Sequence, residues 1–251
     1  MTGHFPWITA HTGCMDTLDN TLVSVEEGIR MGADIIEDDI RVTRDGIAIL
    51  AHDDIWQSVD GRTIQISALS FKELQSIEVI VDYAGKTGKM TFSTLEDLLL
   101  LIKGSGRTAN LDLKVDEAID AAAALVHKHD MLGQIFLSGC GAERALLAQL
   151  RYPELKKLLN ADSEHFLNRS YDEALEQTLS DALAAACFGI NIYHEFVKPE
   201  LIEQAKANGL KVYVWTVNDV SLMEHYASLG VDSLTTRAVV DLVQLKKSMQ
   251  Q

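Results

Sequence analysis

Charged side chains stand two residues apart in two otherwise apolar stretches of the chain. Glu37 and Asp39 lie in IIEDDIRVT, and Asp112 and Lys114 lie in TANLDLKV. Residues two apart on a β-strand face the same side of the sheet, so each pair is expected to point one way. Carboxylates gathered in a low-dielectric site stay ionised only beside a cation. Three oxygen donors without a paired Cys or His favour a hard ion, Mg²⁺ or Ca²⁺, over zinc.

Two histidines fall where strands are expected to end, His11 after PWITA and His52 after GIAILA. Both protonation states of histidine are accessible near neutral pH, so one imidazole can remove a proton while the other donates one. A metal ion and Lys114 would stabilise negative charge on a phosphoryl group. The pattern therefore predicts acid/base chemistry on a bound phosphate.

Short apolar runs alternate with amphipathic stretches along the whole chain, which predicts strands alternating with helices. There are roughly eight such β-then-α units. With 251 residues, the pattern favours closure into a (β/α)₈ TIM barrel, an α/β fold, over an open sheet. The first helix is expected to have Asp19 or Asn20 near its cap and to end at Gly32. RDG, at residues 44–46, predicts a hairpin turn.

Residues 55–90 interrupt this rhythm, because the segment is too polar and too long for a simple connection. We interpret it as an excursion over the barrel mouth that contains a short helix around SFKELQSI. The chain has only three prolines and no stretch typical of a linker. We therefore expect one domain that spans residues 1–251.

The carboxyl ends of barrel strands meet at one mouth, so polar residues at those ends are candidates for a site. In the first half of the chain these are His11, Glu37, Asp39, His52, Asp53, Asp112 and Lys114. In the second half they are Ser138, Asn160, Asn191, Trp215 and Thr235. The charge is thus expected on the early strands, with neutral and aromatic groups on the later ones.

The composition narrows the choice of partners. The net charge of −15 argues against nucleic acid or an anionic membrane surface as the main partner. Three cysteines without metal spacing fit a reducing compartment, and the first residues lack the pattern of a signal peptide. No apolar run approaches the ~20 residues of a membrane span. We expect a cytoplasmic protein without stable membrane anchoring, and its oligomeric state stays open.

Several short motifs together resemble the glycerophosphodiester phosphodiesterase family. That family opens with His-Arg-Gly and Pro-Glu-Asn-Thr, continues with Glu-x-Asp, Thr-x-Asp-Gly and His-Asp, and later has Glu-x-Lys, Trp-Thr and Gly-Val-Asp segments. The corresponding segments here are HTG (11–13), LDNT (18–21), EDD (37–39), TRDG (43–46), HD (52–53), DLK (112–114), VWTVND (214–219) and GVDSLTT (230–236). The ordered set spans nearly the whole chain and is far more specific than any single motif.

The resemblance implies a (β/α)₈ barrel that hydrolyses small glycerophosphodiesters to glycerol 3-phosphate and an alcohol. It also implies that the substrate's neighbouring hydroxyl is the nucleophile and that a cyclic phosphate is formed. The roles that it assigns are His11 and His52 as the acid/base pair, Glu37, Asp39 and Asp112 as ligands of Mg²⁺ or Ca²⁺, Lys114 as a phosphate contact, and Trp215 as a wall for the glycerol or the leaving alcohol.

The chain departs from the family pattern at several positions. Thr12 replaces the arginine of the first motif, which removes a phosphate-binding cation. Leu18 and Asp19 replace Pro-Glu, and Asp112 replaces a glutamate, which shortens the third carboxylate. Asp38 is unusual because its side chain should face the helix layer. These changes bear on substrate choice and rate more than on the class of reaction.

Structural alternatives stay open for some of these residues. Glu37 and Asp39 could form ion pairs with Arg41 or Lys114, and Trp215 could be ordinary barrel core. Asp53 fits a turn residue or a partner of a catalytic group better than a metal ligand.

Two alternative functions also remain. One is a lipid-headgroup phosphodiesterase of the sphingomyelinase D or lysophospholipase D type, which would need an apolar rim for acyl chains. The other is a non-catalytic barrel that binds a phosphorylated ligand, which the lost arginine and the shortened carboxylates favour.

Overall fold

The computed structural model describes residues 4–83 and 86–250. Parallel strands form a nearly closed barrel in the order β10-β11-β12-β13-β1-β2-β8-β9. The strands are β1 (Trp7–Ala10), β2 (Ile35–Val42), β8 (Thr108–Leu113), β9 (Ile135–Ser138), β10 (Leu158–Asn160), β11 (Gly189–Tyr193), β12 (Lys211–Trp215) and β13 (Ser233–Thr236). A parallel bridge between Leu137 and Lys157 joins the two end strands. The prediction of a (β/α)₈ barrel is confirmed.

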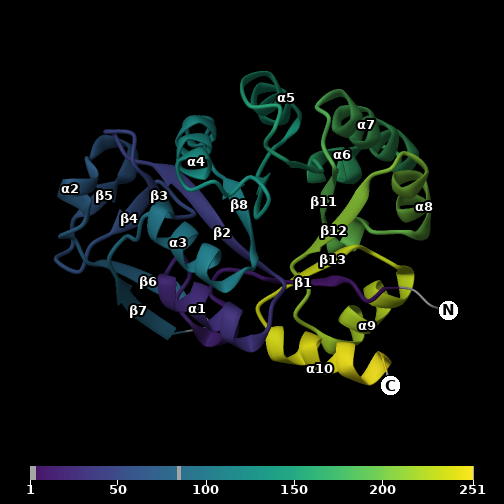
Figure 1. Ribbon diagram of the computed structural model, residues 1–251, viewed down its shortest axis with the longest axis horizontal. Helices are drawn as coiled ribbons and strands as arrows, with labels where there is room; N and C mark the ends of the chain where they lie inside the picture. The colour runs from purple at the N-terminus through teal and green to yellow at the C-terminus, as the bar shows by residue number, and fades with distance from the viewer. Residues whose placement is uncertain (1–3, 84–85, 251) are drawn as a thin grey trace.

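Helices follow the strands and surround the barrel (Figure 1). They are α1 (Leu22–Met31), α3 (Leu95–Ser105), α4 (Glu117–Lys128), α5 (Ala142–Arg151), α6 (Ser163–Asn168), α7 (Tyr171–Ala184), α8 (Pro199–Ala207), α9 (Val220–Leu229) and α10 (Val239–Met249). Short 3₁₀ turns are η1 (Cys14–Asp16), η2 (Ile66–Ala68) and η3 (His194–Phe196). No described helix is both long enough and apolar enough to cross a membrane.

Helix α1 begins and ends at defined capping residues. The helix ends at Gly32, which adopts a left-handed conformation with φ 93° as expected. Its N-cap is Thr21, whose hydroxyl accepts a hydrogen bond from the Ser24 amide, so Asp19 and Asn20 lie near the cap as predicted, although neither is the capping residue. Asn20 has φ 57° and takes part in a different network, described below.

The excursion is a folded insertion. It follows β3 (Ala48–Leu50), which pairs antiparallel with β2 as the hairpin signal predicted. Its elements are β4 (Ile55–Gln57), β5 (Thr63–Gln65), η2, α2 (Phe71–Leu74), β6 (Val79–Tyr83) and β7 (Lys86–Met90). It lies to one side of the barrel in Figure 1, and its buried apolar side chains form a separate cluster with Ile49 and Ala51 of the hairpin.

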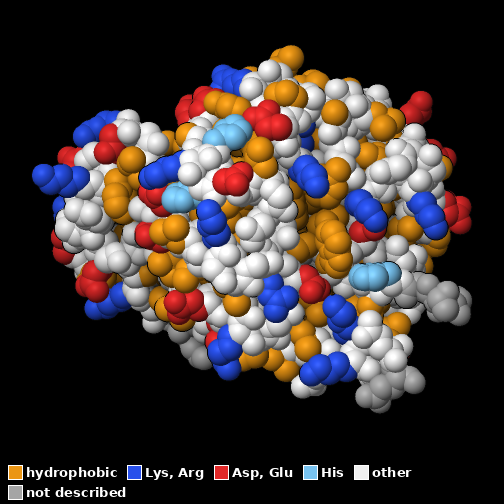
Figure 2. Space-filling model, viewed as in Figure 1, with side chains coloured by type: hydrophobic (Ala, Val, Ile, Leu, Met, Phe, Trp, Pro, Cys, Tyr) orange, Lys and Arg blue, Asp and Glu red, His pale blue; other side chains and the backbone are white. Residues whose placement is uncertain are grey.

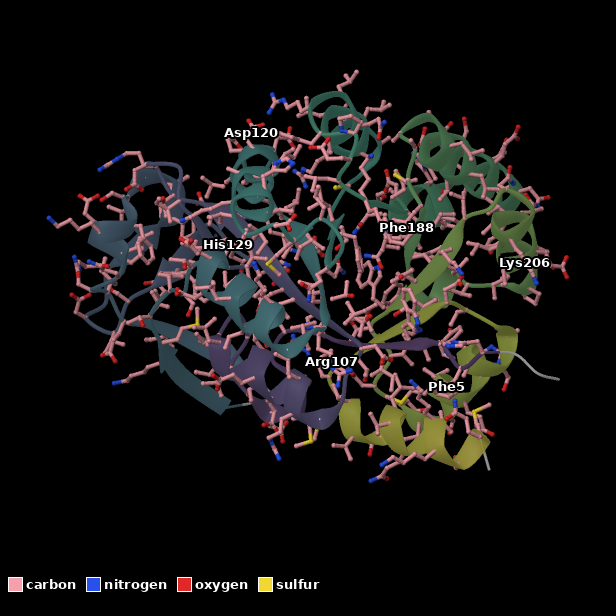
Figure 3. The ribbon with its side chains drawn as sticks, viewed as in Figure 1. Phe5, Arg107, Asp120, His129, Phe188 and Lys206 are labelled. Atoms are coloured by element: carbon pink, nitrogen blue, oxygen red, sulfur yellow. The ribbon has the colours of Figure 1, made fainter. Side chains whose placement is uncertain are left out.

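Alternation along β2 divides its side chains between two layers. Ile36 and Ile40 belong to the core between the strands and the helices. Ile35 faces the barrel interior, where it clusters with Phe136 and Tyr213; Phe188, labelled in Figure 3, packs against these two rings. Glu37 and Asp39 share the parity of Ile35, so they also face the interior, nearer the carboxyl end of the strand.

The surface carries charges of both signs. On the face drawn in Figure 2, Lys and Arg side chains are spread among acidic and apolar ones rather than gathered in one basic patch.

Candidate active site

The carboxyl ends of the barrel strands surround a cavity of about 360 Å³. The seven residues to which the resemblance assigned roles all line this one cavity, namely His11, Glu37, Asp39, His52, Asp112, Lys114 and Trp215. Asp53 and Ser138, which were also candidates at strand ends, are not among its lining residues. Their elements are far apart in the sequence, and they meet because the carboxyl ends of parallel strands converge. None of the described residues of the excursion is among those that line the cavity.

Three carboxylates form the acidic part of the cavity. Glu37 and Asp39 lie on β2, and Asp112 lies opposite Asp39 on the neighbouring strand β8. One ligand oxygen from each lies within 4.8 Å of the others. Oδ1 of Asp112 is buried and has no hydrogen-bond partner among the described residues. Three carboxylates with converging oxygens fit a hard divalent cation.

Lys114 offsets part of this negative charge. Its ammonium lies 2.9 Å from Oδ1 of Asp39 and 3.5 Å from Oδ1 of Asp112. The ion pair considered as an alternative for Asp39 is thus present, but it lies within the cluster rather than replacing it.

The three carboxyls differ in the direction in which their surroundings shift the pKa. Burial, together with repulsion from Asp39, raises the pKa of Glu37 well above its usual range. Burial raises the pKa of Asp112 to about 6, although Lys114 opposes that change. Burial also acts to raise the pKa of Asp39, but Lys114 and the Asn20 amide outweigh it, and the pKa is lowered. A bound cation would favour the ionised form of all three.

His11 follows β1 and faces Glu37. Its Nδ1 lies 2.7 Å from the carbonyl oxygen of Thr12 and 3.9 Å from Oε2 of Glu37. A carbonyl only accepts, so Nδ1 carries the proton and Nε2 of the neutral ring is left as a proton acceptor. Burial, followed by the positive charge of Arg237, lowers the pKa of His11. This imidazole is therefore suited to act as a base.

His52 follows β3 and lies on the open side of the cavity. Its side chain is 62 % exposed, and its Nδ1 lies 2.9 Å from Oδ1 of Asp53. Asp53 therefore contacts an imidazole rather than the acidic cluster, in keeping with the interpretation of its sequence position. The backbone of His52 is held by hydrogen bonds from Arg41 Nε to its carbonyl and from its amide to Oδ1 of Asn20.

Asn20 links the residues around the cavity, a role that the sequence analysis missed. Its Nδ2 donates to Asp38 at 2.8 Å and to Asp39 at 3.0 Å. Thr12 is buried and donates its hydroxyl to Asp38, so it faces away from the cavity. Burial and the charge of Asp39 raise the pKa of Asp38 to about 8. The only sequence signal for Asn20 was its place in the LDNT motif.

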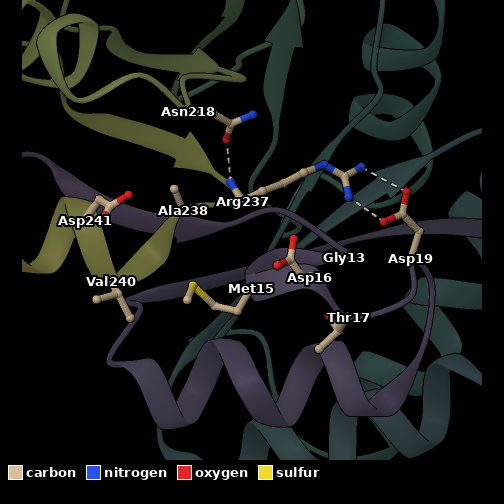
Figure 4. Close-up of a pocket in the computed structure, with 10 residues that line it drawn as sticks. All are labelled: Gly13, Met15, Asp16, Thr17, Asp19, Asn218, Arg237, Ala238, Val240 and Asp241. Atoms are coloured by element: carbon tan, nitrogen blue, oxygen red, sulfur yellow. Dashed lines mark hydrogen bonds and ion pairs between the residues drawn. The ribbon is translucent and has the colours of Figure 1, made fainter. Parts of the chain in front are cut away.

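Arg237 was also missed. Both of its terminal nitrogens pair with Asp19, which joins the end of β13 to the loop after β1 (Figure 4). This pair borders a second hollow of about 450 Å³, next to the loop that begins at Gly13. Gly13 has φ +73°, which favours glycine, and a Cβ atom there would also displace the ion pair. Arg237 acts on the site through its charge, which lowers the pKa of His11.

The later strands supply neutral groups to the cavity, as expected. Asn160, Asn191 and Thr235 line it beside Trp215. The Trp215 ring lies 5.4 Å from that of Tyr193, and its Nε1 is buried without a hydrogen-bond partner among the described residues. Trp215 therefore faces the cavity and also packs like a core residue.

A (β/α)₈ barrel with an acidic cluster, a lysine and two imidazoles at its mouth presents groups that can bind a phosphate and transfer protons. The sequence profile of the glycerophosphoryl diester phosphodiesterase family matches residues 5–240. The chain therefore belongs to this family and is an enzyme of the phosphoric diester hydrolase class.

Individual proteins resemble the chain in sequence and in fold. The glycerophosphodiester phosphodiesterase of Caldanaerobacter subterraneus subsp. tengcongensis is 21 % identical over 95 % of this chain and 96 % of its own. A crystal structure from Silicibacter pomeroyi that carries the family name has a TM-score of 0.85 at 22 % identity and covers 99 % of this chain and 96 % of its own. A phosphodiesterase of Oleispira antarctica, solved with the product sn-glycerol-3-phosphate, has a TM-score of 0.77 at 24 % identity and 97 % coverage of both chains.

Proposed function

We propose that the protein hydrolyses small glycerophosphodiesters to glycerol 3-phosphate and an alcohol, with a divalent cation and two histidines. The observation that carries this proposal is that Glu37, Asp39 and Asp112 place ligand oxygens within 4.8 Å of one another in a cavity that both imidazoles line. The product complex of the Oleispira antarctica phosphodiesterase supports the same class of substrate.

The acidic cluster would hold Mg²⁺ or Ca²⁺ through one oxygen each of Glu37, Asp39 and Asp112. The ion would supply positive charge to the non-bridging phosphoryl oxygens. Lys114, which lies between Asp39 and Asp112, adds a second positive charge on that side of the cavity. Trp215 forms part of the wall for the glycerol or the alcohol portion.

His11 and His52 would divide the proton transfers between them. Nε2 of His11 takes the proton from the glycerol hydroxyl next to the ester, and that oxygen attacks phosphorus. His52 gives a proton to the leaving alcohol oxygen as its bond to phosphorus breaks, which leaves a cyclic phosphate. Water then opens the ring, with the two imidazoles acting in the opposite sense. Attack within one bound molecule avoids most of the entropic cost of a bimolecular step.

The direct test is incubation with glycerophosphocholine and glycerophosphoethanolamine. We expect glycerol 3-phosphate to be released with Mg²⁺ or Ca²⁺, and the release to stop when EDTA is added. A His11→Ala, His52→Ala double variant that keeps the fold should bind the cation without turnover. If no diester is cleaved with either metal, the proposal fails, and the non-catalytic alternative takes its place.

A lipid-headgroup substrate is less well supported. Among the described residues that line the cavity, Leu113 and Trp215 are the large apolar ones, and the excursion contributes none. We therefore expect the deacylated headgroup diester to be cleaved in preference to the lysolipid. Product analysis with both substrates in parallel decides this point, because faster cleavage of the lysolipid would favour the alternative.

A further inference from the structure

The positive charge available to a phosphate at the mouth is limited. Thr12 carries no charge, and its buried hydroxyl donates to Asp38 rather than pointing into the cavity. The ammonium of Lys114 is held by two carboxylates. Among the described residues that line the cavity, the remaining cation of fixed charge is Arg144, on helix α5. Arg144 was not among the residues predicted from the sequence.

The guanidinium of Arg144 is fixed in place by its surroundings. Nη1 donates to the carbonyl oxygens of Leu113 and Gly139 at 2.7 and 2.6 Å, and Nε donates to Asp116 at 2.6 Å. Nη2 has a single contact among the described residues, at 3.5 Å from the carbonyl of Lys114. A guanidinium carries five N–H donors, so the Nη2 group keeps donor capacity that the protein does not use.

The chain before Arg144 is shaped to bring it close to the acidic cluster. Gly139 directly follows β9 and has φ +68°, and a Cβ atom there would collide with Oδ1 of Asp112 and the backbone of Leu113. Glycine is therefore required at this position, and its carbonyl accepts from Nη1 of Arg144. Helix α5 begins at Ala142, so Arg144 lies in its first turn, directly beside the strand that carries Asp112.

We propose that Arg144 is a substrate-binding residue whose Nη2 group donates to a non-bridging phosphoryl oxygen of the diester. The inference deepens the proposed function and rests on it for the identity of the substrate. The phosphoryl group would then contact both a cation held by the acidic cluster and the pre-positioned planar guanidinium that lies beside Lys114. Because the hydrogen bonds of Nη1 and Nε already fix the side chain of Arg144, little side-chain entropy is lost when substrate binds.

The test compares Arg144→Gln, Arg144→Lys and Arg151→Gln, each with Mg²⁺ or Ca²⁺ present. Arg151 is a matched control, because it lies on the same helix and pairs with Asp120 outside the cavity. The dissociation constants of sn-glycerol 3-phosphate and inorganic phosphate are measured by calorimetry, with glycerol as an uncharged probe. Melting temperatures report on any purely structural effect.

We expect Arg144→Gln to weaken binding of both phosphate ligands about 10- to 100-fold, the size expected for a hydrogen bond to a charged group. Arg144→Lys should weaken it by about 3- to 10-fold, because a point charge cannot keep the same contacts. Arg151→Gln should change it less than twofold. A folded Arg144→Gln protein that binds phosphate within about twofold of the parent overturns the proposal. If Arg144→Gln does not fold, unchanged binding by Arg144→Lys overturns it instead.

Turnover is measured separately, so that the two proposals can fail independently. A parent that binds glycerol 3-phosphate through Arg144 but cleaves no diester contradicts the proposed function and leaves the binding role intact. A parent that cleaves diesters while Arg144→Gln keeps its KM contradicts the role of Arg144 alone. A parent that binds neither phosphate ligand overturns the role of Arg144 as well.

Discussion

The two halves of the barrel mouth occupy equivalent positions in the fold but carry different side chains. The ends of β1, β2 and β8, with the hairpin strand β3, supply the carboxylates, the lysine and both imidazoles. The ends of β10 to β13 supply amides, a hydroxyl and an indole to the same cavity. The barrel thus offers a side-chain position at the end of each strand, whereas the ionisable groups lie on neighbouring strands, where each can be close to a group of opposite charge.

Neighbouring strands explain why the charge gathers in one half. The register between β2 and β8 places Asp39 opposite Asp112, and Lys114 lies within ion-pair distance of both. A carboxylate placed alone on a later strand would be buried without such a partner, and burying its charge would cost free energy. The neutral half can then be shaped for the organic part of a substrate.

The largest expected effect is in the charged half. Glu37→Gln keeps the shape of the side chain but removes a negative ligand, so we expect diester cleavage to fall by at least about 1,000-fold and cation affinity to fall with it. Isothermal titration with Mg²⁺ and an assay for glycerol 3-phosphate check both. Glu27→Gln, at an exposed pair with Arg30, should leave both unchanged. Normal activity of the Glu37 variant would contradict the role of the cluster.

The next effect concerns proton transfer. His52→Gln should lower kcat about 100-fold or more, because the leaving oxygen would depart without a proton. Asp53→Asn changes only the group that contacts Nδ1 of the imidazole, so a smaller loss, about 10-fold, is expected. Steady-state kinetics on both variants measure the difference. Equal losses would mean that His52 acts through Asp53 or through the fold rather than on the substrate.

A smaller effect is expected in the neutral half. Trp215→Leu removes an aromatic wall but no charge, so we expect KM to rise about 2- to 10-fold while kcat changes little. The rise should depend on which alcohol the diester carries, and a series of diesters measures it. If Trp215→Leu lowered kcat as much as His52→Gln, the neutral half would contribute to the chemical step as much as the charged half.

The smallest expected effect is a change in pH dependence. His11 must be neutral to act as a base, and burial together with Arg237 lowers its pKa below the ordinary 6.5. Arg237→Gln removes the positive charge, so the pKa should rise and the acidic limb of kcat/KM should move to higher pH. Arg30→Gln is the control, because Arg30 pairs with Glu27 on an exposed part of α1. An unchanged acidic limb would show that His11 is not the group that titrates there.

Local patterns were sufficient for most of the fold and for the composition of the site. Alternating apolar runs predicted the eight barrel units, and two-residue spacing predicted that Glu37 and Asp39 face the interior. Asn20 was expected only near the cap of α1, and its long-range hydrogen bonds to β2 could not be predicted from the local sequence. Arg144 was missed because it lies in the first turn of helix α5, where arginine is usually a solvated surface residue. Arg237 directly follows β13, but the end of that strand was predicted near Thr235 and the residues after it were not considered.

The sequence by itself determined the barrel, the ordered motifs and the kinds of groups at the mouth, because strand parity and turn chemistry act over a few residues. Only the tertiary structure decided which groups touch. It brought Asp112 against Asp39, turned Thr12 away from the cavity toward Asp38, and placed the guanidinium of Arg144 beside Lys114. These contacts join residues from different strands and helices, so they depend on register and packing that no single stretch of the chain contains.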